Sequence, residues 1–289
     1  MNHRIIARLD IKGPNLVKGI HLEGLRVLGK PEDFAKYYYE SGADELMYID
    51  VVASLYERNS LKDIITRTAK EIFIPLTVGG GLRSIADITE VLRAGADKVS
   101  LNTSAIRNPG LITGASRKFG SSTIVVTIEA IRHADGLYYA YIDNGREATG
   151  VEVVSWAKRV EELGAGELVI TSVDREGTGK GYDLELTRQV ASSVSIPVIA
   201  HGGAGQFDHV REVIQEGDAD AVAIASILHY EMIEHNNPVH HFSKEGNTEF
   251  LKKKIKFGPI TPASIDEIKN NLVQHNVPCR HYESEVTEC

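Results

Sequence analysis

The second half of the sequence repeats the order of short motifs found in the first half, at a spacing of about 120 residues. Residues 5–10 (IIARLD) resemble residues 124–129 (IVVTIE), and residues 74–81 (IPLTVGGG) resemble residues 196–203 (IPVIAHGG). Each motif is an apolar run followed by polar residues or glycine, and amphipathic segments separate the motifs. Such alternation is typical of βα units on a parallel sheet. Any βα protein resembles itself to some degree, but blocks that match in the same order favour two half-barrels.

Eight apolar runs fit the strands of one closed barrel. Parallel strands that are covered on both faces are apolar along their whole length. The predicted strands begin near Ile5, Glu45, Leu76, Lys98, Ile124, Glu167, Val198 and Ala221. Predicted helices occupy residues 31–41, 60–72, 84–94, 152–163, 184–193 and 264–274. The predicted fold class is therefore α/β, a (βα)8 TIM barrel of two half-barrel repeats that forms a single domain over residues 1–289.

Two segments interrupt this regular pattern. Residues 132–149 contain alternating tyrosines before the turn signal Asn144-Gly145, which predicts a hairpin inserted after the fifth strand. Residues 229–262 are a longer polar insertion after the eighth strand, and whether it is a lid or a docking surface stays open. Both segments follow the carboxyl ends of strands, the face at which (βα)8 barrels place their active sites.

Asp10 and Glu129 stand at the ends of the first and fifth predicted strands. In a closed barrel of eight strands these ends face each other across the mouth, so that two carboxylates share one cavity. Such a pair suits acid and base catalysis. A single carboxylate at a strand end is more often a helix cap or a solvated residue, but the symmetry of the two positions favours the catalytic interpretation.

Glycine-rich turns follow the third and seventh predicted strands. Glycines there let backbone N–H groups approach an anion closely at the N-terminus of a helix. The candidate phosphate-binding residues are Gly80, Gly81, Asn102 and Thr103 in the first half and Gly202, Gly203, Ala225 and Ser226 in the second half. One such turn is weak evidence, but two turns at symmetric positions predict a substrate with two phosphates.

Four charged residues stand at the starts of strands, on the opposite side of the barrel. They are Arg4, Glu45, Lys98 and Glu167. Two positive and two negative groups at the N-terminal mouth can form a charged ring. In most barrels such a ring is surface salt bridging of little energetic weight.

The composition excludes several classes of protein. A formal net charge of −8 argues against a nucleic-acid-binding protein, which needs a basic face to neutralise phosphates. The apolar runs fall short of the roughly 20 residues that a membrane span requires, so we expect no membrane association. The N-terminus lacks a signal-type apolar stretch, so we expect a cytoplasmic location. Two cysteines, Cys279 and Cys289, provide no disulfide framework and no CxxC metal spacing.

The insertion after the eighth strand is rich in histidine and lysine. The histidines are His229, His235, His240 and His241. They lack an accompanying cysteine pair or HExxH motif, so no metal site is predicted. The run Lys252-Lys253-Lys254 is expected to be a solvated face or a partner-docking patch. No motif requires a metal or an organic cofactor.

The motifs together resemble HisF, the cyclase subunit of imidazole glycerol phosphate synthase, along nearly the whole chain apart from the two insertions. The resemblance is carried by residues 4–12 (RIIARLDIK), 17–19 (VKG), 77–81 (TVGGG), 95–103 (GADKVSLNT), 171–178 (TSVDREGT) and 202–205 (GGAG). The related isomerase HisA shares the repeat and the phosphate sites but fits the first and sixth of these motifs less well.

The resemblance implies a barrel that receives ammonia from a HisH-like glutaminase docked at its N-terminal face. The charged ring would gate the entry of ammonia, which then travels through the barrel to the C-terminal mouth. There it would meet a bisphosphorylated small molecule, with Asp10 and Glu129 as the acid–base pair. The resemblance also implies that Gly177 joins the phosphate-binding residues. The implied substrate-pocket residues are Lys18, Asp50, Thr171, Glu176 and His201.

Four residues depart from the HisF pattern, and they gather around one cavity. Glu129 and Glu176 each replace an Asp, His201 replaces a Ser, and Arg8 replaces a Cys. The extra methylene of Glu129 moves its carboxyl group by up to roughly 1.5 Å, one C–C bond length. A misplacement of about 1 Å can lower a rate on the order of a hundredfold. The four departures therefore predict a different substrate.

This pattern, together with residues 17–28 (VKGIHLEGLRVL), resembles the HisF-like paralogues of bacterial surface-sugar pathways, including the WbuZ-like group. That resemblance implies a subunit that passes ammonia from a glutaminase to a separate sugar amidotransferase, for acetamidino sugars of the O-antigen type. Ammonia delivery is the expected function. The alternative is an authentic imidazole glycerol phosphate synthase cyclase of histidine biosynthesis, a lyase that uses Asp10 and Glu129, and a third possibility is an isomerase or another phosphosugar enzyme.

Overall fold

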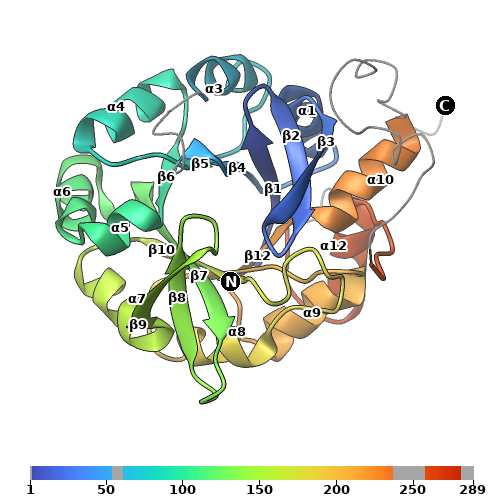
Figure 1. Ribbon diagram of the computed structural model, residues 1–289. Coiled ribbons are helices and arrows are strands. Elements are labelled where there is room, and N and C mark those ends of the chain that lie inside the picture. The colour runs from blue at the N-terminus through green and yellow to red at the C-terminus, as the bar shows by residue number, and fades with distance from the viewer. Residues whose placement is uncertain (1, 54–60, 237–257, 281–289) are drawn as a thin grey trace.

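The barrel wall consists of parallel strands that close into a ring (Figure 1). The computed structural model describes residues 2–53, 61–236 and 258–280. The wall strands are β1 (Arg4–Lys12), β4 (Glu45–Asp50), β5 (Leu76–Gly79), β6 (Lys98–Leu101), β7 (Ile124–Arg132), β10 (Glu167–Ser172), β11 (Val198–His201) and β12 (Ala221–Ile224). Pairing of β6 with β7 and of β12 with β1 joins the two half-barrels, and pairing of β7 with β10 completes the ring within the second half. The predicted TIM barrel is therefore confirmed, and each wall strand begins within one residue of its predicted start.

Helices surround the wall (Figure 1), and most of them bury apolar residues on one side. They are α1 (Pro31–Glu40), α3 (Lys62–Thr68), α4 (Ile85–Ala94), α5 (Thr103–Arg107), α6 (Gly110–Phe119), α7 (Val153–Glu162), α8 (Leu184–Ala191), α9 (Phe207–Gln215), α10 (Ser226–Asn236) and α12 (Ile265–Gln274). Helix α1 shows the principle, because Phe34, Ala35 and Tyr38 lie at spacings that point them to the core. Helices α4 and α12 each begin with a serine capping box, which fixes their N-termini. None of the described helices is long and apolar enough to cross a membrane.

Two antiparallel hairpins extend the barrel at its C-terminal mouth. The hairpin of β2 (Asn15–Ile20) and β3 (Glu23–Gly29) continues from β1, and the hairpin of β8 (Tyr138–Ile142) and β9 (Glu147–Glu152) continues from β7. The first was not predicted, because its turn is made by His21 and Leu22 at φ of 52° and 61° rather than by glycine or asparagine. The two hairpins stand on opposite strands of the ring.

The interior of the barrel is layered, because alternate residues of each wall strand point inward. In β1 the inward residues are Arg4, Ile6, Arg8 and Asp10, from the N-terminal to the C-terminal mouth. An apolar layer occupies the middle of the barrel and consists of Ile6, Met47, Val125, Val169, Ile199, Ala221 and Ala223. The charged ring lies on one side of this layer and the candidate site on the other.

Part of the second predicted insertion falls on α10, which includes His229 and His235. Residues 237–257, and with them His240, His241 and the three consecutive lysines, lie outside the described residues, as does Cys289.

Candidate active site

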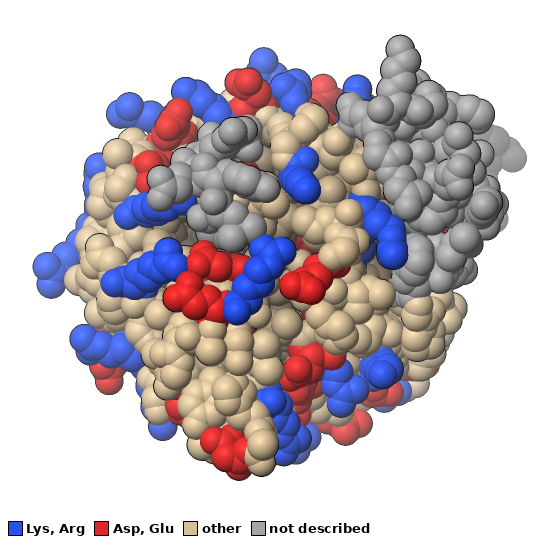
Figure 2. All heavy atoms as spheres, in the orientation of Figure 1, with Lys and Arg blue, Asp and Glu red and all other residues tan. Residues whose placement is uncertain are grey.

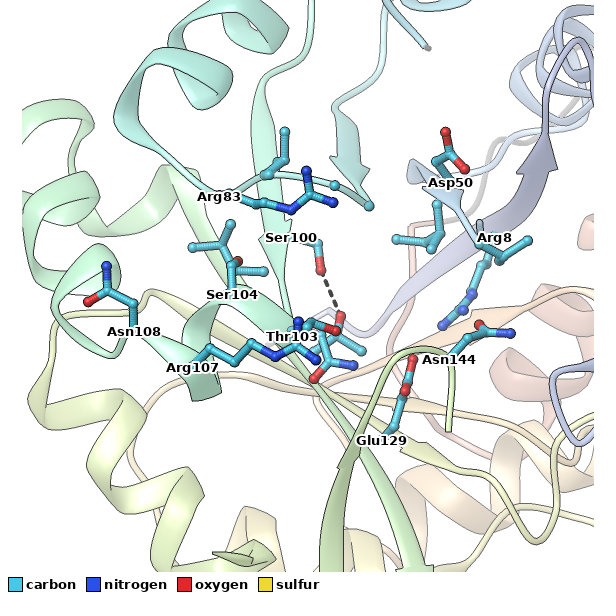
Figure 3. Close-up of a pocket in the computed structure, with 18 residues that line it drawn as sticks. Arg8, Asp50, Arg83, Ser100, Thr103, Ser104, Arg107, Asn108, Glu129 and Asn144 are labelled. Atoms are coloured by element: carbon cyan, nitrogen blue, oxygen red, sulfur yellow. Dashed lines mark hydrogen bonds between the residues drawn. The ribbon is translucent and has the colours of Figure 1, made fainter. Parts of the chain in front are cut away.

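A cavity of about 220 Å³ opens at the C-terminal mouth, in the half formed by β4, β5, β6 and β7 (Figure 3). The polar residues and glycines that line it are Arg8, Asp50, Gly80, Gly81, Arg83, Ser100, Asn102, Thr103, Ser104, Arg107, Asn108, Thr127, Glu129 and Asn144. Most of them end strands or begin the loops that follow, as expected for the active-site face of such a barrel. The cavity therefore brings together one of the two predicted catalytic residues and the first predicted phosphate cradle.

Glu129 lies near the end of the buried part of β7 and is 8% exposed. Burial raises the pKa of its carboxyl group to about 7, although Oε2 accepts a hydrogen bond of 2.7 Å from the Gly145 N–H and Arg8 lies nearby, both of which lower the pKa. A carboxyl group with a pKa near 7 can donate or accept a proton at neutral pH.

Asp10 lies across the mouth, on the opposite strand, and is 4% exposed. Its Oδ1 accepts a hydrogen bond of 2.9 Å from Arg8 Nε, so the two residues form a buried ion pair. The two predicted catalytic carboxyl groups therefore have different environments. Asp10 is held by a cation, whereas Glu129 is held by a backbone N–H.

Arg8 occupies the centre of the mouth and is 2% exposed. Its Nη1 lies 3.1 Å from His201 Nδ1 and 3.5 Å from Thr171 Oγ1. Burial lowers the pKa of His201 well below its usual value, and the cations of Arg8 and Lys18 lower it further, so this imidazole is neutral. Because a guanidinium group only donates, Nδ1 is the acceptor and the ring proton lies on Nε2.

The first predicted phosphate cradle opens into the cavity. Gly80 and Gly81 have φ of 99° and 72°, and a Cβ at Gly80 would lie 2.4 Å from the carbonyl oxygen of Asp50, so the turn requires glycine. Asn102 and Thr103 follow β6, and Asn102 Oδ1 is buried without a hydrogen-bond partner among the described residues. Such an acceptor is suited to a hydroxyl or amine of a ligand.

The second predicted cradle does not open in the same way. A Cβ at Gly202 would lie 2.7 Å from the Ser172 carbonyl oxygen, and a Cβ at Gly203 would lie 2.1 Å from the Gly181 carbonyl oxygen. These glycines therefore permit close packing of backbone against backbone. Gly177 packs in the same manner, with a Cβ position 2.6 Å from the carbonyl oxygen of Gly19.

A separate small cavity of about 10 Å³ lies beside Lys18, Gly177 and Ser226. A cavity of this size holds about one water molecule. Ala225 and Ser226 are themselves buried. The two halves of the mouth are therefore symmetric in sequence but unequal in open space.

The β2–β3 hairpin covers the second half of the mouth. Lys18 forms a buried ion pair with Glu176, whose other oxygen accepts a hydrogen bond of 2.8 Å from the Leu22 N–H. The neighbouring hairpin joins this contact, because Asn144 Nδ2 donates to the Leu22 carbonyl oxygen at 2.8 Å. Of the predicted pocket residues, Lys18, Thr171, Glu176 and His201 therefore lie in this covered half, and Asp50 lines the open cavity.

The four charged residues at the N-terminal mouth form a closed ring of alternating sign. Arg4 Nη1 lies 2.6 Å from Glu45 and 2.9 Å from Glu167, and Lys98 Nζ lies 3.1 Å from Glu45 and 3.2 Å from Glu167. Each charge has two partners of opposite sign. The side chains are at most 24% exposed, so these pairs are less screened than surface pairs.

Several cavity residues were not predicted as site residues. Arg83 follows the glycine turn by two positions, and Arg107 lies four positions after Thr103, a spacing that places both on one side of a helix. An arginine two positions after a glycine-rich turn is the signal that would have found Arg83. Arg107 is also paired with Asp143 and Glu147, at 2.7 Å and 3.0 Å. Among the described residues no group of His, Cys, Asp and Glu is arranged to hold a metal ion.

Comparison with known proteins identifies the family. The model of the histidine biosynthesis protein family matches residues 4–234. The chain is 58% identical over 207 residues to imidazole glycerol phosphate synthase subunit HisF of Legionella pneumophila, covering 72% of this chain and 98% of the relative. The subunit of the same name from Alkaliphilus metalliredigens is 48% identical over 227 residues, which covers 78% of this chain and 90% of the relative. The subunit from Methanocaldococcus jannaschii is also 48% identical, over 249 residues, which covers 80% of this chain and 92% of the relative. The chain therefore belongs to the histidine biosynthesis protein family and, within it, to the HisF proteins.

Proposed function

We propose that this chain is the cyclase subunit of an imidazole glycerol phosphate synthase. In this reaction ammonia adds to a bisphosphorylated ribulosyl aminoimidazole substrate, and C–N cleavage and closure of the imidazole ring follow. The three relatives described above carry the name of this enzyme. The expectation of a sugar-pathway paralogue receives no support from them.

The observation that carries the proposal is the pair of buried carboxyl groups at one mouth. Glu129 lines the open cavity, and its pKa of about 7, raised by burial, allows it to act as the general acid that protonates the leaving nitrogen. Asp10, oriented by Arg8, is the candidate for the base. The cradle of Gly80, Gly81 and Thr103 is the candidate for a phosphate of the substrate.

The proposed partner is a HisH-like glutaminase at the N-terminal face, where the ring of Arg4, Glu45, Lys98 and Glu167 would regulate the entry of ammonia. The apolar layer above the ring favours passage of neutral ammonia over ammonium, because an unpaired ion is costly in apolar surroundings.

A second candidate is the delivery of ammonia to a separate acceptor enzyme, such as a sugar amidotransferase. One observation favours it. Arg8 fills the centre of the mouth and pairs with Asp10, so the carboxylate expected to act as base is already engaged.

Turnover of the bisphosphorylated substrate with saturating ammonium distinguishes the two candidates. The purified chain should form imidazole glycerol phosphate, and Glu129→Gln should lower kcat by about 100-fold or more, because it removes a general acid. A matched control is Glu147→Gln, which changes an exposed carboxylate on β9 outside the cavity lining. If the wild-type protein forms no product while it stimulates a glutaminase partner, the cyclase proposal fails and ammonia delivery replaces it.

A further inference from the structure

We propose that Asn144 is a positioning residue for Glu129. Its side chain anchors the turn between β8 and β9, and this turn holds the Gly145 N–H against the carboxyl group of Glu129. The inference rests on the proposed function in taking Glu129 to be the general acid. It adds a residue that acts on the acid through the backbone of its neighbour.

The turn between β8 and β9 consists of residues with left-handed backbone. Asp143, Asn144 and Gly145 have φ of 52°, 62° and 75°. Asparagine and aspartate tolerate this conformation better than most residues, but it is still uncommon for them. A run of such residues persists where contacts from outside the turn hold it in place.

Two buried or partly buried contacts hold the turn. Asn144 is 8% exposed, and its Nδ2 donates a hydrogen bond of 2.8 Å to the carbonyl oxygen of Leu22, on the β2–β3 hairpin. The Asp143 N–H donates a hydrogen bond of 3.1 Å to Thr103 Oγ1. The side chain of Asp143 also pairs with Arg107, but Arg107 is 55% exposed, so this pair contributes little. The Asn144 amide is therefore the buried side-chain anchor of the turn.

The anchored turn acts on Glu129 through the Gly145 N–H, which donates a hydrogen bond of 2.7 Å to Oε2. Asn144 and Glu129 both line the cavity (Figure 3). Burial raises the pKa of Glu129 to about 7, and among the groups that lower this pKa the Gly145 N–H has the largest effect, ahead of Arg8 and Asn102. A hydrogen bond to the carboxylate favours its charged form. Movement of the turn away from Glu129 would therefore raise the pKa further.

The charged groups that face Glu129 come from β1. Arg8 lowers the pKa of Glu129, and Asp10 raises it. Tyr141, the partner of Glu129 on β8, has its hydroxyl group 3.0 Å from His133 Nε2 instead. None of these groups belongs to the turn, so a substitution at the turn leaves them in place.

Carbon-13 NMR titration of the Glu129 carboxyl group, in the protein without substrate, tests this inference. The wild-type signal should titrate near pH 7 and should be absent from Glu129→Gln. Asn144→Gly removes the amide anchor but permits a left-handed backbone. In this variant the pKa of Glu129 should rise to about 8, because the hydrogen bond that favours the carboxylate is weakened. The Gly145 N–H should also exchange with solvent about tenfold faster or more.

Two further variants complete the test. Asp135→Ala removes contacts to Leu137 and Tyr139 at the other turn of the same hairpin, and it should leave the pKa of Glu129 unchanged. Thr103→Val removes the second anchor of the turn and should raise the pKa in the same direction, which keeps the test available if Asn144→Gly does not fold. An unchanged pKa of Glu129 in the anchor variants, or an equal rise in Asp135→Ala, would overturn the inference.

Turnover measurements separate this inference from the proposed function. If the chain is a cyclase, the inflection in the pH profile of kcat should move in Asn144→Gly to the same higher pH as the titration. Absence of turnover in the wild-type protein, together with a raised pKa of Glu129 in Asn144→Gly, would refute the cyclase reaction and leave the positioning role of Asn144 standing.

Discussion

Asp10 and Glu129 occupy equivalent positions in the two half-barrels, yet their surroundings differ. Asp10 accepts a hydrogen bond from Arg8, whereas Glu129 accepts one from the Gly145 N–H and is otherwise in a buried position that favours its neutral form. Two carboxyl groups whose environments differ in this way can divide the roles of acid and base between them.

The raised pKa of Glu129 predicts a pH dependence of stability. Between its unfolded value of 4.5 and its folded value of about 7, the folded protein holds a proton that the unfolded chain releases. The resulting stabilisation is fully present below pH 4.5 and is lost as the pH rises through 7. From pH 5 to pH 8 the wild-type protein should lose roughly 2–3 kcal/mol more unfolding free energy than Glu129→Gln, which cannot titrate. Urea unfolding at the two pH values measures this difference, and identical pH dependence in both proteins would contradict the assignment.

At the scale of elements, the β2–β3 hairpin decides which half of the mouth is open. The buried ion pair of Lys18 and Glu176 attaches this hairpin to the loop after β10. Glu176 also accepts a hydrogen bond from the Leu22 N–H. A buried carboxylate that loses its cation is left uncompensated.

Lys18→Met should therefore destabilise the protein by about 3–5 kcal/mol, measured as the free energy of urea unfolding. The matched control is Lys62→Met, which breaks an exposed ion pair with Glu90 and should cost less than about 1 kcal/mol. Similar losses in the two variants would show that the Lys18 contact is no stronger than a surface pair.

The sequence predicted those elements whose residues form a recognisable pattern within a short stretch of chain. The wall strands are apolar runs, so their starts were predicted from Ile5 to Ala221. No bounds were predicted for helices α5, α6, α9 and α10, and α3 is shorter than expected. The positions of Asp10 and Glu129 at the mouth followed from strand ends, but the pairing of Arg8 with Asp10 depends on side-chain directions that only the assembled barrel sets. Gly203 is needed for close backbone packing, whereas Gly81 lines an open cavity. The sequence shows only a glycine at each position, so it could not distinguish these two roles.

At the scale of the whole molecule, the barrel has two ends with different chemistry and an apolar layer between them. The charged ring closes the N-terminal mouth, and the space-filling view of the C-terminal mouth shows acidic and basic side chains gathered around its centre (Figure 2). Under the proposed function, ammonia made by a glutaminase at the N-terminal face would pass the ring, whereas ammonium added to the solution would reach the C-terminal mouth directly.

Lys98→Met should separate these two routes. The substitution leaves Glu45 and Glu167 with Arg4 as their only partner in the ring, so the ring should rearrange through repulsion of the carboxylates. With a HisH-like glutaminase present, we expect the glutamine-dependent rate to change several-fold and the ammonium-dependent rate to stay within about twofold. Equal changes in both rates would mean that the substitution disturbs the fold as a whole, and they would contradict a role of Lys98 in the entry of ammonia.

The most direct test of the cyclase assignment is the pH profile of kcat for the bisphosphorylated substrate between pH 5.5 and 9, with the concentration of free ammonia held constant. If Glu129 is the general acid, kcat should fall as the pH rises through about 7, and the residual activity of Glu129→Gln should lack this inflection. A wild-type profile without an inflection near pH 7, or the same inflection in Glu129→Gln, would contradict the assignment of Glu129 as the acid of this reaction.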